Sequence, residues 1–299
     1  MTSPYVRRLR LGIELQALRD ERNWTQARAA RMIGKSRQEI SKMERGLSAN
    51  PTDVLNLLEA LGVEDERWTE LTAIARDAAQ PGWWDSLKDI GERQSLYADL
   101  ESGAATIRKY EMTALPGVLQ IPDYTRSISM ANAAIEPLSG TIDGILAGRA
   151  GRQRNLRRPG APVVELIVDE FAVLRRAAPA DVVKRQLRHL AEVVKGGQPN
   201  VTLRVLPAEA QFRDFVVPRG TFSLYTYPDA RDPRVVAIDT VTSDVILFSE
   251  AEVATYERIW EHSREAALPP EESAKFLTEA ADALPDRLTS VVPGGVDGP

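Results

Sequence analysis

The stretch Trp24-Thr-Gln-Ala-Arg-Ala-Ala-Arg-Met-Ile-Gly-Lys-Ser-Arg-Gln-Glu-Ile-Ser-Lys-Met-Glu-Arg-Gly46 decides the fold of the first part of the chain. Thr25 can cap a short helix that ends at Gly34, because a threonine hydroxyl accepts a backbone N–H at a helix start. Ser36 and Glu39 form an S-x-x-E capping box that opens a second helix, which ends at Gly46. The stretch therefore predicts two short helices joined by a tight turn around Gly34.

Two short helices joined in this way are typical of the helix-turn-helix arrangement, whose second helix has the size to enter the major groove of DNA. Three apolar residues of the stretch can face a small core: Ile33, Ile40 and Met43. Four polar residues are then left on the outer face: Arg37, Gln38, Ser41 and Lys42. Arginine pairs with guanine and glutamine with adenine, because their hydrogen-bond forks match those base edges. The pattern predicts that the outer face contacts bases.

Further short helices flank this pair. The spacing of leucines predicts a helix over 5–22, and Asn50-Pro51 supplies a cap and a first-turn proline for a helix up to Gly62. Another helix is expected over 64–78, and the breaker Gln80-Pro81-Gly82 follows it. We therefore predict an all-α, five-helix helix-turn-helix domain over 1–80.

After the breaker the pattern alternates between strands and helices, which predicts a larger mixed α/β domain over 84–284. We expect helices over 92–103, 123–133, 140–158, 169–176, 180–195, 250–267 and 270–284. We expect strands over 105–110, 163–168, 201–206, 221–227, 235–239 and 244–248. The fold class is thus multidomain, α followed by α/β. The tail over 285–299 is rich in proline and glycine and is expected to be disordered.

Composition and charge narrow the class of protein. The 299 residues include no cysteine and two histidines, so we expect no metal site, no cofactor and no thiol chemistry. No apolar run approaches the ~18 residues of a membrane helix, and the start lacks a signal-peptide core, so we expect a cytoplasmic protein without membrane contact. The net charge of −5 divides into +6 over residues 1–50 and −11 over 51–299. The basic part coincides with the helix pair, and the acidic part predicts a protein or small-molecule partner.

The N-terminal stretch resembles the phage-repressor-type (xenobiotic response element, XRE) helix-turn-helix family. The resemblance rests on Thr25, Gln26, Ala30, Gly34, Ser36, Ile40, Ser41 and the run from Met43 to Gly46. It implies a five-helix DNA-binding domain in which Gln26 contacts a phosphate, Arg37, Gln38 and Lys42 face bases, and Arg19 and Glu44 form a buried ion pair. The residues predicted to contact DNA are Gln26, Ser36, Arg37, Gln38, Ser41, Lys42 and Arg45. Two residues depart from the family pattern: Ala29 stands where the family usually has leucine, and Lys35 stands where it usually has a small apolar residue. Both departures are expected to thin the core of the domain.

The rest of the chain resembles the large uncharacterised domain DUF5753, also called Scr1-family antitoxin-like, of actinobacterial regulators. The motifs are Tyr97-Ala-Asp-Leu-Glu, Leu115-Pro-Gly-Val-Leu-Gln-Ile-Pro-Asp-Tyr124, Asp169-Glu-Phe-Ala-Val-Leu-Arg175, Gln186-Leu-Arg-His-Leu190, Val201-Thr-Leu-Arg-Val-Leu-Pro207 and Gly220-Thr-Phe-Ser-Leu224. Members often neighbour a small protein of the DUF397 type, so the resemblance implies a regulatory or antitoxin-like pair.

A few residues of the larger domain carry alternatives. Asp169 and Glu170 follow a predicted strand, and three roles are open for them. They bind a cation or act as acid and base, or they open a helix, whose start favours acidic residues. In the third role, Glu170 holds a buried arginine such as Arg175 or Arg204. His189 lies on an apolar helix and is interpreted as a packing residue. The aromatic residues Trp83, Trp84, Tyr97 and Tyr110 either line a small-molecule pocket or pack at the domain junction. An arginine cluster is either a solvated face, an auxiliary DNA contact or a dock for an acidic partner: Arg149, Arg152, Arg154, Arg157 and Arg158.

The leading hypothesis is a sequence-specific transcriptional regulator that binds a palindromic operator in double-stranded DNA as a homodimer, through a recognition helix at residues 36–46. Its C-terminal domain would sense a partner protein or a small-molecule effector. The alternative is an antitoxin-like binding module that neutralises a small DUF397-type partner and autoregulates its operon. The third hypothesis, an enzyme that uses Asp169 or Glu170, is disfavoured by the missing Cys and His clusters, so the protein is predicted not to be an enzyme.

Overall fold

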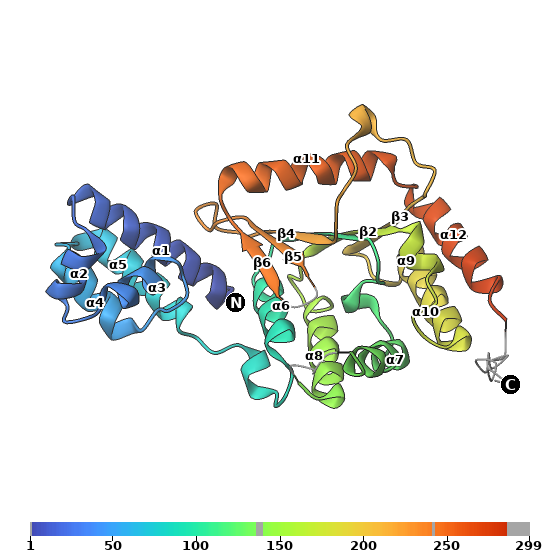
Figure 1. Cartoon of the computed structure of the whole chain (residues 1–299), viewed down its shortest axis with the longest axis horizontal. Coiled ribbons are helices and arrows are strands. Elements are labelled where there is room, and N and C mark those ends of the chain that lie inside the picture. Colours follow the sequence, from blue (N-terminus) through green and yellow to red (C-terminus); the bar gives the residue numbers. More distant parts are fainter. Residues whose placement is uncertain (1, 136–139, 241–242, 286–299) are drawn as a thin grey trace, which may run out of the picture.

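The computed structural model describes residues 2–135, 140–240 and 243–285. Its first part is a bundle of five helices, drawn in blue to cyan in Figure 1. They are α1 (Pro4–Glu21), α2 (Gln26–Met32), α3 (Arg37–Glu44), α4 (Pro51–Ala60) and α5 (Asp65–Ala78). Their apolar faces meet in one small core that includes Leu15, Ile40 and Leu58, so the five predicted helices are confirmed.

The predicted caps position these helices. Thr25 accepts the backbone N–H of Arg28, and Asn50 accepts that of Asp53, with Pro51 in the first turn of α4. A polar side chain at this position satisfies a backbone donor that the helix itself leaves unpaired. Local sequence therefore determines where α2 and α4 begin.

A short 3-10 helix, η1 (Trp83–Ser86), follows the breaker at residues 80–82 and leads into the larger α/β part. Its helices are α6 (Glu92–Ser102), η2 (Gly117–Leu119), α7 (Pro122–Ala133), α8 (Ile142–Asn155), α9 (Glu170–Leu174), α10 (Ala180–Glu192), η3 (Val193–Gly197), η4 (Arg213–Phe215), α11 (Glu250–Ala266) and α12 (Pro270–Asp282). Its strands are β1 (Thr106–Glu111), β2 (Val163–Asp169), β3 (Val201–Leu206), β4 (Phe222–Thr226), β5 (Val235–Asp239) and β6 (Asp244–Leu247). The predicted mixture of strands and helices is confirmed, with ends shifted by a few residues.

Within the described residues the strands form one six-stranded sheet in the order β3-β2-β1-β4-β5-β6. β1, β2 and β3 are parallel, since Thr106 pairs with Val163 and Val164 with Val201. β4 runs antiparallel to β1, and the antiparallel pairing continues through β5 and β6. The sheet therefore changes from parallel to antiparallel at β1.

Helices cover both faces of the sheet. Figure 1 shows α11 along one face and α6, α7, α8 and α10 on the other. The first face packs Phe222 and Val236 against Val253 and Trp260 of α11. The second face forms the largest core, which also receives Leu277 of α12. The layers are those expected when helices bury both faces of a partly parallel sheet.

The two parts of the chain share helix α1. Val6 and Leu9, from its first turns, are buried in the large core of the α/β part, whereas Leu11 and Leu15 belong to the small helical core. The Ser3 hydroxyl also donates to Asp99 of α6 over 2.6 Å. The predicted division into 1–80 and 84–284 stays a prediction, but these contacts show that the α/β core extends into α1.

Two remaining expectations concern the membrane and the tail. Among the described residues, no helix combines the length and the apolar composition that crossing a membrane requires. The predicted disorder of 285–299 falls outside the described residues from 286 onward.

Candidate nucleic-acid interface

The turn between α2 and α3 places the two helices as a helix-turn-helix pair. Gly34 adopts a φ of +66°, in the left-handed region that glycine reaches without steric cost, and no atom lies within 4 Å of the position a Cβ would take. After the turn, Ser36 and Glu39 form the complete capping box, with the Ser36 Oγ accepting the Glu39 backbone N–H and Glu39 accepting that of Ser36. Local chemistry thus determines both the end of α2 and the start of α3.

Helix α3 has a buried and an exposed face. Ile40 and Met43 are buried in the helical core, and Ile33 of the turn packs against it, as predicted. Arg37, Gln38 and Lys42 are exposed, and Ser41 is half-buried. Within the described residues, the side chains of the first three make no hydrogen bond or ion pair with the rest of the chain. Their donors and acceptors are therefore available to a ligand.

The end of α3 is held by a buried ion pair. Arg19 of α1 donates from Nε to Glu44 Oε1 over 2.5 Å and from Nη2 to Oε2 over 3.1 Å. This hydrogen bond to Glu44 raises the pKa of Arg19, against the effect of burial. A paired, doubly hydrogen-bonded carboxylate holds its helix in one orientation. The ion pair that the family resemblance implied is present.

Helix α1 also contacts α3 through its backbone. A Cβ on Gly12 would lie 2.4 Å from the carbonyl oxygen of Glu44, so glycine allows the two helices to approach this closely. Gly46, at φ +68°, in turn lies against Leu9. Because Leu9 belongs to the large core, the position of α3 is coupled to the α/β part.

Three of the remaining predicted residues have internal roles. Gln26 donates from Nε2 to Glu44 over 2.8 Å, which uses one of its two amide hydrogens. The hydroxyl of Ser36 is part of the capping box, and Arg45 is exposed with a long contact of 3.4 Å to the Ser41 carbonyl. Lys35, which was expected to thin the core, is half-buried and its Nζ lies 2.9 Å from Asp53 of α4.

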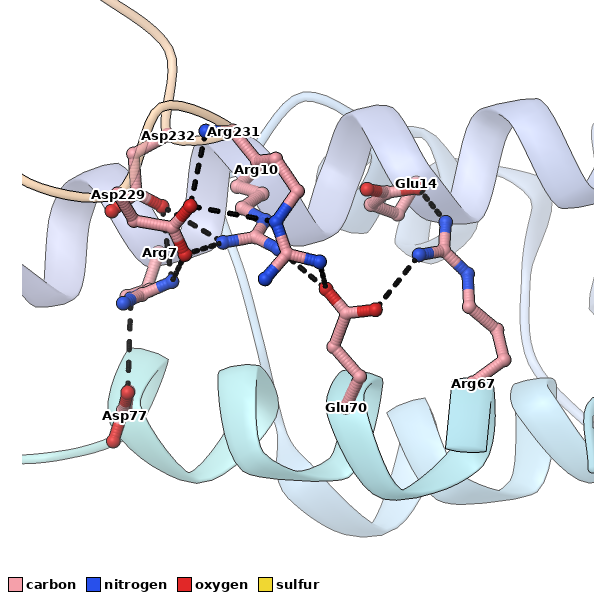
Figure 2. A network of polar contacts seen from close by, with 9 residues as sticks. All are labelled: Arg7, Arg10, Glu14, Arg67, Glu70, Asp77, Asp229, Arg231 and Asp232. Atoms are coloured by element: carbon pink, nitrogen blue, oxygen red, sulfur yellow. Dashed lines mark hydrogen bonds and ion pairs between the residues drawn. The ribbon is translucent and has the colours of Figure 1, made fainter. Parts of the chain in front are cut away.

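Sequence reasoning missed an ion-pair network that joins the helical and α/β parts (Figure 2). Arg10 of α1 donates to Glu70 of α5 over 2.6 Å and to Asp229 over 2.7 Å. Arg7 donates to Asp232 over 3.0 Å. The Arg10 side chain is 2% exposed and that of Asp232 is fully buried. The only sequence signal was a pair of arginines on a leucine-rich helix, and nothing local identified their partners.

The acidic pair at the end of β2 and the start of α9 has a structural role. Asp169 accepts the Tyr110 hydroxyl over 2.8 Å and the Phe171 backbone N–H over 2.9 Å. Glu170 accepts the backbone N–H of Ala208 over 2.7 Å. The suggestion that Glu170 holds Arg204 is wrong, since Arg204 donates to the carbonyl of Leu268. Asp169 thus caps helix α9, and Glu170 holds the backbone that follows β3.

The aromatic residues do not share a pocket. Trp83 and Trp84 pack edge to face at 5.8 Å beside Ile90 and Ala98. The hydroxyl of Tyr97 bonds Asp239 on one face of the sheet, while Tyr110 lies in the core on the opposite face. His189 is half-buried, and burial lowers its pKa, as does the nearby Arg157. These findings favour the packing interpretation.

The arginine cluster is only partly a solvated face. Arg154 and Arg157 are exposed, but Arg152 is buried and pairs with Glu101, its Nε lying 2.8 Å from the carboxylate. The Nε and Nη1 atoms of Arg149 are buried without a hydrogen-bond partner among the described residues. Burial and the neighbouring Arg152 lower the pKa of Arg149 to about 10. The cluster therefore extends from solvent into the space between α8 and the sheet.

Comparison with protein families accounts for both parts of the chain. The family model described as Domain of unknown function (DUF5753) matches residues 94–279, more than half of the chain. The chain belongs to the DUF5753 family. A second family model, Helix-turn-helix, matches residues 15–68, which contain the α2–α3 pair. The protein is therefore a helix-turn-helix DNA-binding regulator with a C-terminal DUF5753 domain. No curated protein and no solved structure matches the chain.

The DUF5753 domain contains a cleft that sequence reasoning did not identify. A cavity of about 600 Å³ lies at the carboxyl end of β1, lined by Glu111, Asp239 and Arg93 among others. Below it, Lys109 lies 3.1 Å from Glu111 and 3.3 Å from Asp239. In α/β sheets, ligands bind at the carboxyl ends of strands where the topology changes, as it does at β1. The signal in the sequence was the charged pair Lys109 and Glu111, which shares one strand face with Ile107 at the end of the predicted strand over 105–110.

The two carboxyl groups of this cleft have pKa values shifted in opposite directions. Burial raises the pKa of Glu111, although Lys109 acts in the opposite direction. Burial also acts to raise the pKa of Asp239, but Lys109 and the Tyr97 hydroxyl hold it below its usual value. The lowered pKa of Asp239 favours its charged form, whereas the raised pKa of Glu111 favours its neutral form. The cleft thus presents two carboxyl groups of different acidity to any ligand that enters it.

Proposed function

We propose that this regulator reads a palindromic operator as a homodimer, with Arg37, Gln38 and Lys42 of α3 contacting base edges in the major groove. The observation that carries the proposal is that these three side chains are exposed and unpaired, on a helix held by Arg19 and Glu44. Exposed residues in the first turns of a recognition helix are those that reach bases. We assign Arg45, with the remaining amide hydrogen of Gln26, to phosphate contacts.

Dimer formation follows from the size of α3. A helix of eight residues presents few base-reading side chains, so one copy specifies too short a site. Two copies on half-sites about one helical turn apart would supply the missing specificity. The operator is therefore expected to be an inverted repeat.

The experiment is selection of binding sites from random duplexes with the full chain, followed by affinity measurements on the enriched site. We expect an inverted repeat and a stoichiometry of two chains per site. Gln38→Ala should weaken cognate binding by ~1–3 kcal/mol and relax one base position. Arg45→Ala is the matched control, because losing a phosphate contact weakens all sequences alike and flattens the salt dependence. Selection without an enriched motif, or one without symmetry, would contradict the proposal.

We further propose that the DUF5753 domain is the sensor, and that α6 transmits its state to α1. Tyr97 and Glu101 of α6 bond the charged groups under the cleft, Asp239 and Arg152. Between them, Asp99 accepts the hydroxyl of Ser3 and, over 3.1 Å, the backbone N–H of Tyr5. A ligand that shifts α6 would therefore act on the helix that positions α3. We assign no catalytic step to the domain, since Asp169 and Glu170 already hold backbone groups.

The second candidate is the antitoxin-like function, in which the DUF5753 domain grips a small DUF397-type protein. The observation that favours it is the exposed apolar side chain of Phe215, next to a groove on the same domain. Binding of the neighbouring gene's product to the full chain, with and without operator DNA, would test it. If no such complex forms while operator binding persists, the sensor role must lie with a small molecule.

A further inference from the structure

An apolar groove lies between helix α11 and the segment 215–221. Its volume is about 810 Å³. The residues that line it are Phe215, Val216, Val217, Arg219, Gly220, Thr221, Phe222, Ile238, Thr255, Tyr256, Arg258, Ile259 and His262. Figure 1 shows α11 on the face of the sheet opposite to α7 and α8, and no residue of α1 to α5 lines the groove. A molecule bound there would leave the recognition helix free.

The segment at the mouth of the groove holds apolar side chains in solvent. Phe215 is 92% exposed and Val217 is 53% exposed. Asp214 and Phe215 adopt φ angles of +54° and +57°, in the left-handed region that non-glycine residues rarely occupy. Conformations of this kind occur where the strain serves a function. The strained backbone here presents an aromatic ring that the chain itself does not bury.

The charges around the groove are unbalanced. Its charged lining residues are Arg219 and Arg258, and neither has a carboxylate partner among the described residues. Three glutamates line the adjoining pocket with Arg258: Glu257, Glu261 and Glu265. Two of them are already paired, since Glu257 accepts from Arg234 over 2.7 Å and Glu261 from Arg264 over 2.8 Å. The groove therefore offers apolar surface flanked by two guanidinium groups without a carboxylate partner among the described residues, of which that of Arg258 donates to Thr255 Oγ1 over 3.4 Å.

We propose that this groove docks an acidic amphipathic helix of a partner protein. Apolar side chains of that helix would pack on Phe215 and Tyr256, and its carboxylates would pair with Arg219 and Arg258. Amphipathic helices commonly bind apolar grooves in this way, and arginine forms directed, bidentate bonds with carboxylates. The proposal rests on the partner-binding role proposed above and names the surface and the chemistry of the partner.

The test uses a fluorescein-labelled synthetic helix with Leu and Phe on one face and Glu on the other, and a matched peptide in which every Glu is Lys. Fluorescence anisotropy with the full chain should show at least ~10-fold tighter binding of the Glu peptide. Phe215→Asp, and separately the pair Arg219→Glu with Arg258→Glu, should each weaken binding by ~10-fold or more. Phe215→Ala serves as a milder variant, and unchanged far-ultraviolet circular dichroism verifies folding of each.

The controls are Met130→Asp on α7 and Arg154→Glu on α8, both exposed residues of helices on the other face of the sheet. They should leave the affinity for the Glu peptide unchanged. Equal affinity for the two peptides, or groove variants that bind as wild type does, would overturn the proposal. Conversion of a dimer to a monomer by Phe215→Asp in sedimentation velocity would also overturn it, by identifying a second copy as the occupant.

Operator binding by the same variants separates this inference from the proposed function. Groove variants should bind the operator with unchanged affinity. Weakened operator binding in Gln38→Ala with peptide binding intact would confirm that the two surfaces act independently. If the selection experiment finds no operator but the Glu peptide binds, the regulator proposal fails and the docking site stands.

Discussion

Replacing Arg10 with methionine tests whether the network in Figure 2 holds the two parts of the chain together. Methionine keeps the apolar stem but removes the guanidinium, which lies 2.6 Å from Glu70, 2.7 Å from Asp229 and 3.4 Å from Asp232. Removing one member of a buried ion pair costs about 3–5 kcal/mol, because the remaining charge stays buried without compensation. Glu70 and Asp229 are 25% and 29% exposed and keep Arg231 as a partner, so we expect the lower end, ~3 kcal/mol.

The assay is urea unfolding of the full chain followed by tryptophan fluorescence, with Trp24 and Trp68 reporting on the helical core and Trp260 on the α/β part. The matched control is Arg188→Met, because Arg188 and its partner Asp282 are both more than half exposed and such pairs contribute less than ~1 kcal/mol. Adding Asp232→Asn to Arg10→Met should not recover the loss, since Asp232 keeps Arg7 as a partner over 3.0 Å and its removal would leave Arg7 without that ion pair. A loss below ~1 kcal/mol in Arg10→Met would refute the reasoning.

Three more predictions concern α1, α3 and pH. Gly12→Ala should destabilise the chain by ~1–3 kcal/mol and weaken operator binding, because its Cβ meets the carbonyl of Glu44; thermal unfolding and anisotropy measure both effects. Ser36→Ala should cost ~1 kcal/mol through loss of the cap, and Ser36→Asp should recover it in thermal unfolding. The Arg231 backbone N–H and Arg10 hold the pKa of Asp229 well below its usual value, against the effect of burial. Because the pKa of Asp229 is lower in the folded than in the unfolded chain, its ionised form stabilises the folded chain above pH ~4, and this stabilisation is lost as the pH falls further. The urea midpoint should therefore fall less steeply below pH ~4 in Asp229→Asn than in wild type.

The helix-turn-helix could be predicted almost entirely from local sequence. Thr25, Ser36 and Asn50 each cap a helix by accepting the backbone N–H of the residue three positions ahead. Such hydrogen bonds depend only on neighbours along the chain. The alternation of Ile40 and Met43 with Arg37 and Lys42 likewise assigned the faces of α3 without knowledge of the rest of the fold. Strand and helix order in the DUF5753 domain followed from the same kind of local pattern.

Burial of charged residues could not be predicted in this way. Arg149 and Arg152 read as part of a solvated cluster, yet α8 turns them toward the sheet, where Arg152 meets Glu101. Lys109 and Glu111 look like any charged pair in a strand until β5 brings Asp239 beside them. The partners lie far apart in sequence, so periodicity contains no information about them.

Residues close in sequence thus account for the recognition helix, its caps and its exposed base-reading side chains. The tertiary structure alone brings Arg10 to Asp229, places Asp99 against the start of α1 and leaves Phe215 exposed beside α11. The physical reason is the range of the interactions. Capping and periodicity act over three or four residues, whereas ion pairs and shared cores form between segments that only the folded chain brings into contact.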